Sequence, residues 1–190
     1  MQIRKRQSGV TLIELMVTVS IIGILLTIGI PNIRALSETE AVRSHINTFF
    51  STLRYARSEA LSKRAQVVVC PSSNSESATP SCATDASDAN AWHRGWIIFA
   101  NSDGDPNYSY DATTDTLLRV QGALSNSGGI TKITSSATSK LVYRSTGILL
   151  SGGASSFTFD AMSTTVLQKK RVCISLQGRA YVSSSLATCS

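Results

Sequence analysis

Aromatic and charged residues are scarce in this chain of 190 residues, at 6% and 16%, and only four prolines occur. The sequence also lacks the G-x-S-x-G, H-E-x-x-H, Walker and G-x-G-x-x-G patterns in any suitable context. Its many serines lie in loop-like stretches with no evident general base beside them. These absences argue against catalysis, and we expect neither an enzyme nor a bound cofactor.

Positive charge is in excess, with 18 basic and 12 acidic residues and a formal net charge of +6. Arg4, Lys5 and Arg6 supply three of these charges. Without them 15 basic residues face 12 acidic ones, so the rest of the chain carries +3 (15 − 12). This remainder is compatible with binding an anion but does not require it. The 42% hydrophobic content predicts a globular chain rather than a disordered one.

Four cysteines form two couples that are local in the sequence. Neither couple has the C-x-x-C spacing of a zinc ribbon, and His45 and His93 are poorly placed to complete a zinc site. Two disulfides in an oxidising compartment are the favoured interpretation, with four reduced buried thiols as the alternative. Pairing within each couple is one of three connectivities, and the spacing does not decide among them. The cysteines are Cys70, Cys82, Cys173 and Cys189.

One long apolar run covers residues 10–30 and contains a single charged side chain, Glu14. At about 1.5 Å per residue, a helix of this length crosses the hydrocarbon core of a membrane. The basic residues before the run keep the N-terminus cytoplasmic, so the rest of the chain crosses the inner membrane into the periplasm. A carboxylate inside a membrane costs about 2.5 kcal/mol or more, which indicates that Glu14 has a function.

Two simpler interpretations of this N-terminal segment stay open. A secretory signal peptide also has a basic start and an apolar core, and Ala35-Leu36-Ser37 would be a weak cleavage site. The length of the apolar run and its carboxylate count against that interpretation. A single-pass anchor without processing is the other alternative.

The segment RKRQSG-VTLIEL resembles the type III signal of type IV pilins and type II secretion pseudopilins. In that family a prepilin peptidase cuts after a glycine, and the new N-terminal residue is methylated. The resemblance implies a leader of residues 1–9, cleavage after Gly9 and methylation of Val10. The family's usual residue at this position is phenylalanine, so Val10 is a departure that affects methylation more than cleavage. Pro31 falls where pilins commonly have a helix-kinking proline.

The position of Glu14 has a physical rationale in such a protein. Cleavage gives Val10 a free ammonium group, and residues 10 and 14 lie one helical turn apart on the same face. In a filament the N-terminus of one subunit approaches Glu14 of a neighbouring pilin, and a buried carboxylate is tolerated when a cation pairs with it. Glu14 would then set the registry of the subunits. The alternative is a side chain that reaches to the bilayer surface.

Apolar residues recur at three- and four-residue steps beyond Pro31, which predicts that an amphipathic helix of residues 32–65 continues the assembly helix of residues 10–31. Proline lacks an amide hydrogen and would kink this helix rather than end it. Polar residues, including Arg54 and Arg57, occupy the other faces. The apolar steps are too few for a coiled coil. The apolar positions are Val42, Ile46, Phe49, Phe50, Leu53, Ala56, Ala60 and Leu61.

Residues 66–190 contain short apolar runs separated by Ser, Gly, Asn and Asp, which predicts a β-rich globular domain. We therefore expect an α+β fold in which a long, partly transmembrane N-terminal helix packs on a C-terminal antiparallel β-sheet domain. Residues 71–90 read as a long surface loop. The expected strands are Gln66–Cys70, Gly95–Ala100, Thr116–Gln121, Gly129–Ile133, Lys140–Arg144, Ser156–Asp160, Arg171–Leu176 and Ala180–Ser183.

Three stretches of this domain, ARSEALSKRAQVVVCPSS, WHRGWIIFANSDGD and CISLQGRAYV, resemble the FimT/FimU/GspH group of minor pilins and pseudopilins. The resemblance implies one of three roles. FimU-like members are minor pilins of the pilus tip or priming complex, FimT-like members include DNA-binding pilins of natural transformation, and GspH-like members belong to type II secretion. We favour a minor pilin that partners other pilins of one filament and ends on the cell-surface pilus.

DNA binding is the sharpest alternative that the resemblance implies. FimT-like DNA binders share a Gly-Arg-x-Arg motif near the C-terminus, and this chain matches its first arginine but not its second. Cationic side chains there could neutralise phosphates, and an aromatic ring could stack on a base. A hairpin turn at Gln177-Gly178 with solvated charges is the simpler interpretation. The candidate residues are Lys169, Lys170, Arg171, Gly178, Arg179 and Tyr181.

Two further patterns have weaker functional interpretations. Asp103 and Asp105 lie in a run of alternating oxygen-bearing side chains, as in calcium loops, but the run lacks the downstream glutamate of an EF-hand and is interrupted by Pro106. A plain acidic turn is favoured over a metal site. Trp92 and Trp96 could form a ligand surface, but a tryptophan on an apolar strand is more often part of the core.

Overall fold

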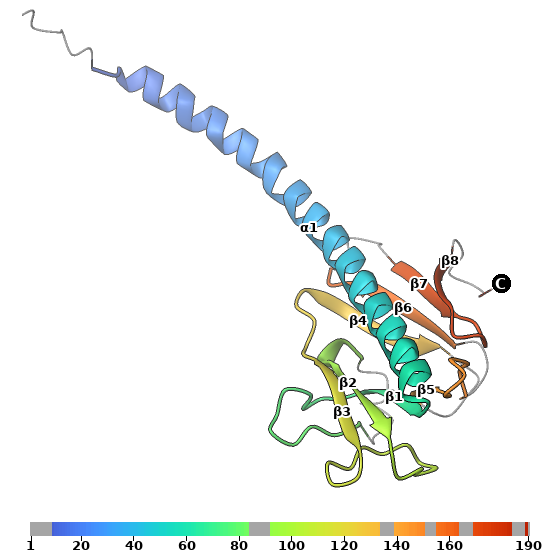
Figure 1. Cartoon of the computed structure of the whole chain (residues 1–190). Helices are drawn as coiled ribbons and strands as arrows, with labels where there is room; N and C mark the ends of the chain where they lie inside the picture. Colours follow the sequence, from blue (N-terminus) through green and yellow to red (C-terminus); the bar gives the residue numbers. More distant parts are fainter. Residues whose placement is uncertain are drawn as a thin grey trace, which may run out of the picture. The chain divides into compact units, whose positions relative to one another are not determined.

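The computed structural model describes residues 9–83, 92–133, 139–150, 155–163, 169–183 and 189, as an N-terminal helix and eight strands (Figure 1). The predicted α+β fold class is confirmed. The chain divides into two compact units, residues 1–37 and residues 38–190. One helix, α1 (Leu12–Lys63), runs through both units and includes Pro31 within its length. Proline therefore does not end the helix, and the predicted kink stays a prediction.

The C-terminal end of α1 lies two residues before the predicted end at residue 65. Arg64 follows the last helical residue with a φ of 52°, the left-handed conformation that commonly closes a helix. The chain then turns directly into strand β1 (Gln66–Pro71). The end of α1 is thus set by backbone conformation rather than by a change in hydrophobic pattern.

All eight expected strands occur, with ends that differ by up to two residues from the predicted ones. They divide into two antiparallel sheets, ordered β3-β2-β1-β5 and β4-β6-β7-β8. The alternation of apolar runs and turn residues in the sequence did not indicate this division. A short 3-10 helix, η1 (Trp92–Arg94), precedes β2. The strands after β1 are β2 (Trp96–Asn101), β3 (Thr116–Gln121), β4 (Ser127–Ile133), β5 (Leu141–Tyr143), β6 (Ser155–Ala161), β7 (Lys169–Ile174) and β8 (Ala180–Ser183).

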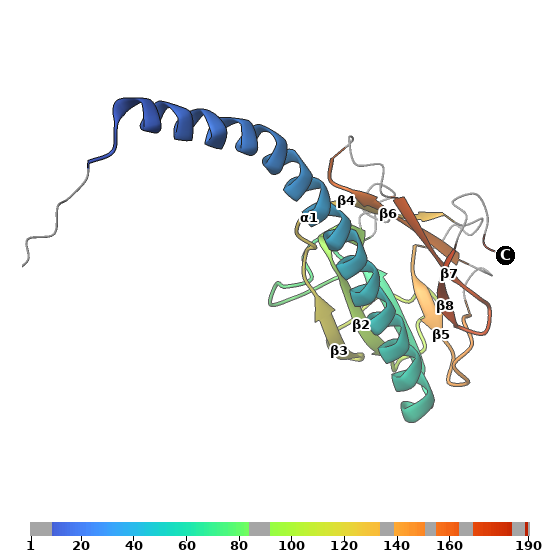
Figure 2. The same ribbon diagram turned by 90° about the horizontal axis from the view of Figure 1, so that it is seen from above.

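The main hydrophobic core lies between both sheets and the half of α1 that begins at Val42 (Figure 2). Phe49 occupies the centre of this core. The centroid of its ring lies 4.7 Å from that of Phe157 and 5.7 Å from those of Trp92 and Trp96. Both tryptophans are fully buried, so the interpretation of Trp96 as a core residue is confirmed, and Trp92 belongs to the core as well. The alternative of an aromatic ligand surface is wrong for this pair.

The first sheet is covered on both faces, as the alternation of side chains along β1 shows. Val67 and Val69 point into the core beside α1, whereas Val68 and Cys70 belong to a second cluster with Tyr108 and other residues. Every buried residue of both clusters lies between Val42 and Ile174. Residues 38–190 thus hold both cores and form one compact unit, which we expect to fold without the helix before it.

Candidate assembly helix and surface pockets

The first half of α1 presents apolar side chains on every face. The exposed fractions of its large apolar residues between 10 and 36 range from 46% at Ile30 to 77% at Leu12. Among the described residues, α1 is the one helix whose length and composition suit a membrane span. A helix that is apolar all round needs either lipid or other helices to cover it. This surface is therefore the first candidate functional site.

Glu14 lies in the first turn of α1 and is its only acidic residue there. Its backbone amide donates a hydrogen bond to the Thr11 hydroxyl at 3.3 Å. Thr11 thus occupies the cap position and Glu14 the third helical position, which is the Thr-x-x-Glu spacing of a capping box. The positive end of the helix dipole favours a carboxylate at this place.

The proposed cleavage site lies at the start of the described chain. Gly9 and Val10 precede the helix without regular secondary structure, and the added Cβ of an alanine at Gly9 would meet nothing within 4 Å. Residues 1–8 of the predicted 1–9 leader, which include its basic residues, lie outside the described residues. Processing after Gly9 and methylation of Val10 therefore stay predictions at this point.

Both local cysteine pairings occur in the structure. Cys70 of β1 is bonded to Cys82, and Cys173 of β7 is bonded to Cys189. The first disulfide brings Cys82 into the cluster on the outer face of the first sheet. Of the predicted 71–90 loop, residues 84–90 lie outside the described part. The structure thus chooses one of the three connectivities that the spacing left open.

The six DNA-binding candidates do not form one cluster. Lys169 and Lys170 begin β7, which spans roughly 17 Å, whereas Gly178 and Arg179 lie in the turn after its other end. The ammonium group of Lys169 lies 3.3 Å from a carboxylate oxygen of Asp160. The hairpin turn expected at Gln177-Gly178 is confirmed, closed by a 2.8 Å bond from the Gly178 amide to the Ser175 carbonyl. DNA binding by these residues stays a prediction.

The structure instead brings Arg179 to two arginines of α1. Arg54, Arg57 and Arg179 line a pocket of about 210 Å³ together with Leu53, Gly178 and Ala180. Gly178 makes this approach possible at a φ of 74°, because an added Cβ would lie 2.7 Å from the Gly147 carbonyl oxygen. Sequence reasoning missed this cluster. The one feature of the sequence that pointed to this cluster was the three-residue step between Arg54 and Arg57, which puts both on one helix face.

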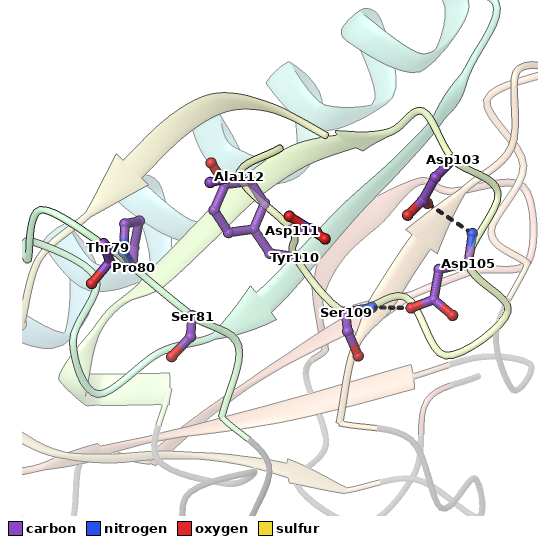
Figure 3. A pocket seen from close by; sticks show the side chains of 9 residues that line it. All are labelled: Thr79, Pro80, Ser81, Asp103, Asp105, Ser109, Tyr110, Asp111 and Ala112. Atoms are coloured by element: carbon purple, nitrogen blue, oxygen red, sulfur yellow. Dashed lines mark hydrogen bonds between the residues drawn. The ribbon is translucent and has the colours of Figure 1, made fainter. Parts of the chain in front are cut away.

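The carboxylates of Asp103 and Asp105 hold the loop between β2 and β3 in shape. Asp103 accepts a bond from the amide of Asp105 at 2.9 Å, and Asp105 accepts a bond from the amide of Ser109 (Figure 3). Asp105 also accepts a bond from the amide of Asn107. The bonds from the amides of Ser109 and Asn107 lower the pKa of Asp105 below its usual value. Within the described part no three His, Cys, Asp or Glu side chains are placed to hold a metal. The favoured interpretation of an acidic turn accounts for this geometry.

The same loop lines a second pocket. Asp103, Asp105 and Asp111 face a cavity of about 510 Å³ that is closed on its other side by Thr79, Pro80 and Ser81 (Figure 3). Hydrogen bonds from the hydroxyl and amide of Thr113 lower the pKa of Asp111 as well. The pocket is therefore anionic at neutral pH.

Comparison with known families decides what kind of protein this is. The family model for type II transport protein GspH matches residues 45–178, from the middle of α1 to the β7–β8 turn. The chain belongs to the GspH family. A model of the prokaryotic N-terminal methylation motif matches residues 4–30 of this GspH-family protein. The predicted membership of the FimT/FimU/GspH group of minor pilins and pseudopilins is confirmed, and such proteins assemble with other pilins.

The fold of this GspH-family protein is similar to that of a solved minor pilin. A crystal structure of type IV minor pilin FimU from Pseudomonas aeruginosa PAO1, in space group P21, matches with a TM-score of 0.52 at 20% identity, covering 78% of this chain and 92% of that one. A second FimU crystal structure from the same strain, in space group P65, matches with a TM-score of 0.47 at 21% identity. It covers 78% of this chain and 91% of that one. No curated protein sequence matches this chain. At 20% identity, the likeness to the P21 structure shows the pilin fold.

Proposed function

We propose that this GspH-family protein is a minor type IV pilin that is cleaved after Gly9 and enters a pilus through residues 10–30. One observation supports this above all. The apolar side chains of Leu12, Ile24 and Ile33 are 62% to 77% exposed, and they contact no core in the described chain. Before assembly the inner membrane covers this surface, and sister helices replace the lipid in the filament.

Glu14 gives this assembly its registry. After cleavage the amine of Val10 begins the chain one turn before Glu14, and the same two groups occur on every subunit. When helices pack with an axial offset, the amine of one subunit meets the carboxylate of the next. The pairing neutralises a charge that would otherwise lie in an apolar surrounding. Only offsets that make this pair are stable, so Glu14 selects among the ways in which the helices can slide.

A type II secretion pseudopilin is the second candidate function. The match to the family of type II transport protein GspH favours it. Both roles use the same processing and helix packing, so the N-terminal segment does not separate them. Deletion of the gene separates them: loss of pili with normal secretion supports the minor pilin, and loss of secretion with normal pili supports the pseudopilin.

N-terminal sequencing of the mature protein tests the proposal. We expect Val10 as the first residue, with one added methyl group by mass spectrometry. Gly9→Ala should leave the precursor at its full size, because the peptidase requires the glycine. Gly23→Ala is the matched control, since it also lies in the described N-terminal segment with nothing within 4 Å of an added Cβ. A mature chain that begins at Met1 or Glu38 contradicts the proposal.

A further inference from the structure

Three exposed aliphatic residues are brought together at the C-terminal end of α1. Leu61, Ile148 and Leu176 are each about half exposed, at 46% to 52%. Gly147, the neighbour of Ile148, packs on Leu61, because an added Cβ would lie 3.2 Å from the Leu61 side chain. The Leu149 amide donates a 3.0 Å hydrogen bond to the Leu176 carbonyl, which holds the β7–β8 turn beside them. We call Leu61, Ile148 and Leu176 the apolar patch.

The apolar patch is built on tight turns rather than on loose loops. The Gly147 amide donates to the Arg144 carbonyl at 2.8 Å, and the Gly178 amide donates to the Ser175 carbonyl at 2.8 Å. These two turns contact each other, because an added Cβ at Gly178 would lie 2.7 Å from the Gly147 carbonyl oxygen. A preformed surface of this kind loses little conformational entropy when a partner covers it.

Arginines form the rim of the apolar patch. The Arg57 Nε atom would lie 3.1 Å from an added Cβ at Gly147, and Arg144 begins the Gly147 turn. Arg54 and Arg179 line one pocket together with Arg57. Within the described part of the chain none of these four arginines forms an ion pair with a carboxylate, and the buried Nε atom of Arg57 has no hydrogen-bond partner. The rim therefore carries positive charge that the domain itself does not neutralise.

This layout is that of a protein–protein interface. Such interfaces have an apolar centre and a polar rim, and arginine is enriched in them. The charge of the rim indicates what covers the patch, because uncompensated arginines attract a surface that carries carboxylates. A nucleic acid would pair with the arginines, but its charged backbone would leave the three aliphatic side chains without an apolar partner.

The place of the apolar patch argues against a lipid surface as its partner. Glu38 is the first residue of the globular unit, and Leu61 lies roughly 35 Å further along α1 at about 1.5 Å per residue. The candidate membrane span joins the unit at Glu38. The patch is therefore at the end of the unit that is farthest along the helix from the membrane span.

We propose that the apolar patch and its arginine rim form the docking surface for a different pilin of the same filament, which presents an apolar surface edged with aspartate or glutamate side chains. The inference rests on the proposed function, in which this minor pilin has other pilins as its neighbours. The assembly helix holds subunits together but discriminates little among apolar helices. The apolar patch adds the choice of neighbour, because a pilin with a cationic surface is repelled by the rim.

Photo-cross-linking of the full-length protein in cells that assemble the filament tests this contact. A benzophenone amino acid replaces Leu176 of the patch, and a separate sample carries it at Ile13 of the assembly helix. Mass spectrometry identifies the partner and the cross-linked peptide. We expect the probe at position 176 to join the globular domain of a pilin of different sequence, in a peptide that contains carboxylates. The probe at position 13 should join a neighbouring N-terminal helix.

Substitutions around the probe show which groups make the contact. Ile148→Asp should lower the yield of the 176 product about tenfold or more, because it puts a charge into the apolar centre. Arg179→Glu should lower this yield by a smaller factor, about threefold, since it reverses a charge of the rim. The yield of the position 13 product should stay unchanged in both variants, which shows that they still assemble.

Two matched controls lie outside the apolar patch. Met162 is 64% exposed, and the amide of its neighbour Ser163 donates to Glu38 at the start of the unit. Met162→Asp therefore puts the same charge at another exposed apolar position, away from the patch. Lys170→Glu reverses an exposed cation at the start of β7. Both variants should leave the yield of the 176 product unchanged.

Several outcomes overturn the inference. If the position 13 product forms but position 176 joins no other pilin, the docking surface does not exist and the proposed function stands. A 176 product with a second copy of this chain contradicts the choice of a different pilin. A pilin product that survives both Ile148→Asp and Arg179→Glu shows that the patch and its rim do not make the contact. If neither probe joins a pilin, the proposed assembly fails together with the inference.

Other occupants of the apolar patch give distinct results. Attachment of the probe at position 176 to lipid would make a membrane surface the occupant. Salt-sensitive binding of DNA by the full-length protein, lost in Arg179→Glu and kept in Ile148→Asp without any pilin product, would make a nucleic acid the occupant. Either result contradicts docking of a pilin at the apolar patch.

Discussion

The indole N–H of Trp96 donates a hydrogen bond to the hydroxyl of Thr52 at 3.1 Å, across 44 residues of sequence. Both side chains are buried. The Thr52 hydroxyl in turn donates to the Thr48 carbonyl of α1 at 3.0 Å. This chain of two bonds ties strand β2 to the helix inside an otherwise apolar core, and it satisfies the one polar atom of a tryptophan that would be costly to bury alone.

Thr52→Val should lower the free energy of unfolding by about 1–3 kcal/mol, because the indole N–H loses its acceptor while the shape of the core is retained. Urea denaturation of residues 38–190 measures this change. Ser51→Ala is the matched control: the Ser51 hydroxyl donates to the same Thr48 carbonyl at 2.8 Å but is exposed. It should change stability by less than about 0.5 kcal/mol. Equal losses in the two variants would disprove the assigned role of Thr52.

Gly178→Ala should destabilise the domain and open the arginine pocket. Gly178 and Gly104 share a φ of 74°, which costs an L-residue about 1–2 kcal/mol. An added Cβ at Gly178 would also lie 2.7 Å from the Gly147 carbonyl oxygen and 2.9 Å from the Tyr143 ring, whereas one at Gly104 meets nothing. Gly104→Ala therefore isolates the backbone cost. Thermal unfolding should show a larger loss for Gly178→Ala, and the two variants behaving alike would contradict close packing at this turn.

Removing the Cys70–Cys82 disulfide by a double change to alanine should cost about 3 kcal/mol, since the bond closes a loop of 12 residues. This corresponds to a fall of roughly 6 to 12 °C in the melting temperature of a domain of this size. Calorimetry of the oxidised parent and the variant measures it. The reduced parent, which keeps every cysteine side chain but loses both disulfides, controls for the lost side-chain packing. A melting temperature that stays unchanged would show that the bond contributes nothing.

Protonation of His45 should make the domain less stable as the pH falls below 6.5. Burial lowers the pKa of His45 from 6.5, and its hydrogen bond to Ser125 partly opposes this. The Nε2 atom lies 3.0 Å from the Ser125 carbonyl oxygen, but burial outweighs this bond, so the folded state favours the neutral ring. A group with a depressed histidine pKa stabilises the fold fully above 6.5 and loses this contribution as the pH falls through the folded pKa.

His45→Gln tests that sign, because glutamine keeps a hydrogen-bond donor and does not titrate. Unfolding by urea at pH 7 and pH 5 should show a smaller loss of stability in the variant than in the parent. The pKa of His93 is lowered by burial too, so some pH dependence should remain in the variant. An identical pH dependence in both proteins would show that the titration of His45 does not affect stability.

Glu14→Ala should leave processing intact and impair filament assembly, since the peptidase site is unchanged while the registry pair is lost. Electron microscopy counts filaments, and mass spectrometry confirms the N-terminus. Thr11→Val is the control: it removes the helix cap, worth about 1 kcal/mol, but keeps the charge. Normal piliation in Glu14→Ala would rule out registry by charge pairing.

The local pattern of the sequence determined the elements of this protein. The apolar run at residues 10–30 and the three- and four-residue steps after it predicted a helix up to residue 65, and α1 ends at Lys63. Turn residues between short apolar runs placed all eight strands. The burial of Trp96 followed from its apolar strand. These features depend on side-chain periodicity and turn chemistry, which act over a few residues and are visible in the sequence itself.

Only the tertiary structure decided which of these elements meet. It divided the strands into two sheets, selected one disulfide connectivity, and separated Lys169 and Lys170 from Arg179. It also joined Arg179 to two arginines of α1, because the turn at Gly178 packs closely on Gly147. Contacts of this kind depend on the packing of separate segments against one another, for which the periodicity of either segment alone carries no information.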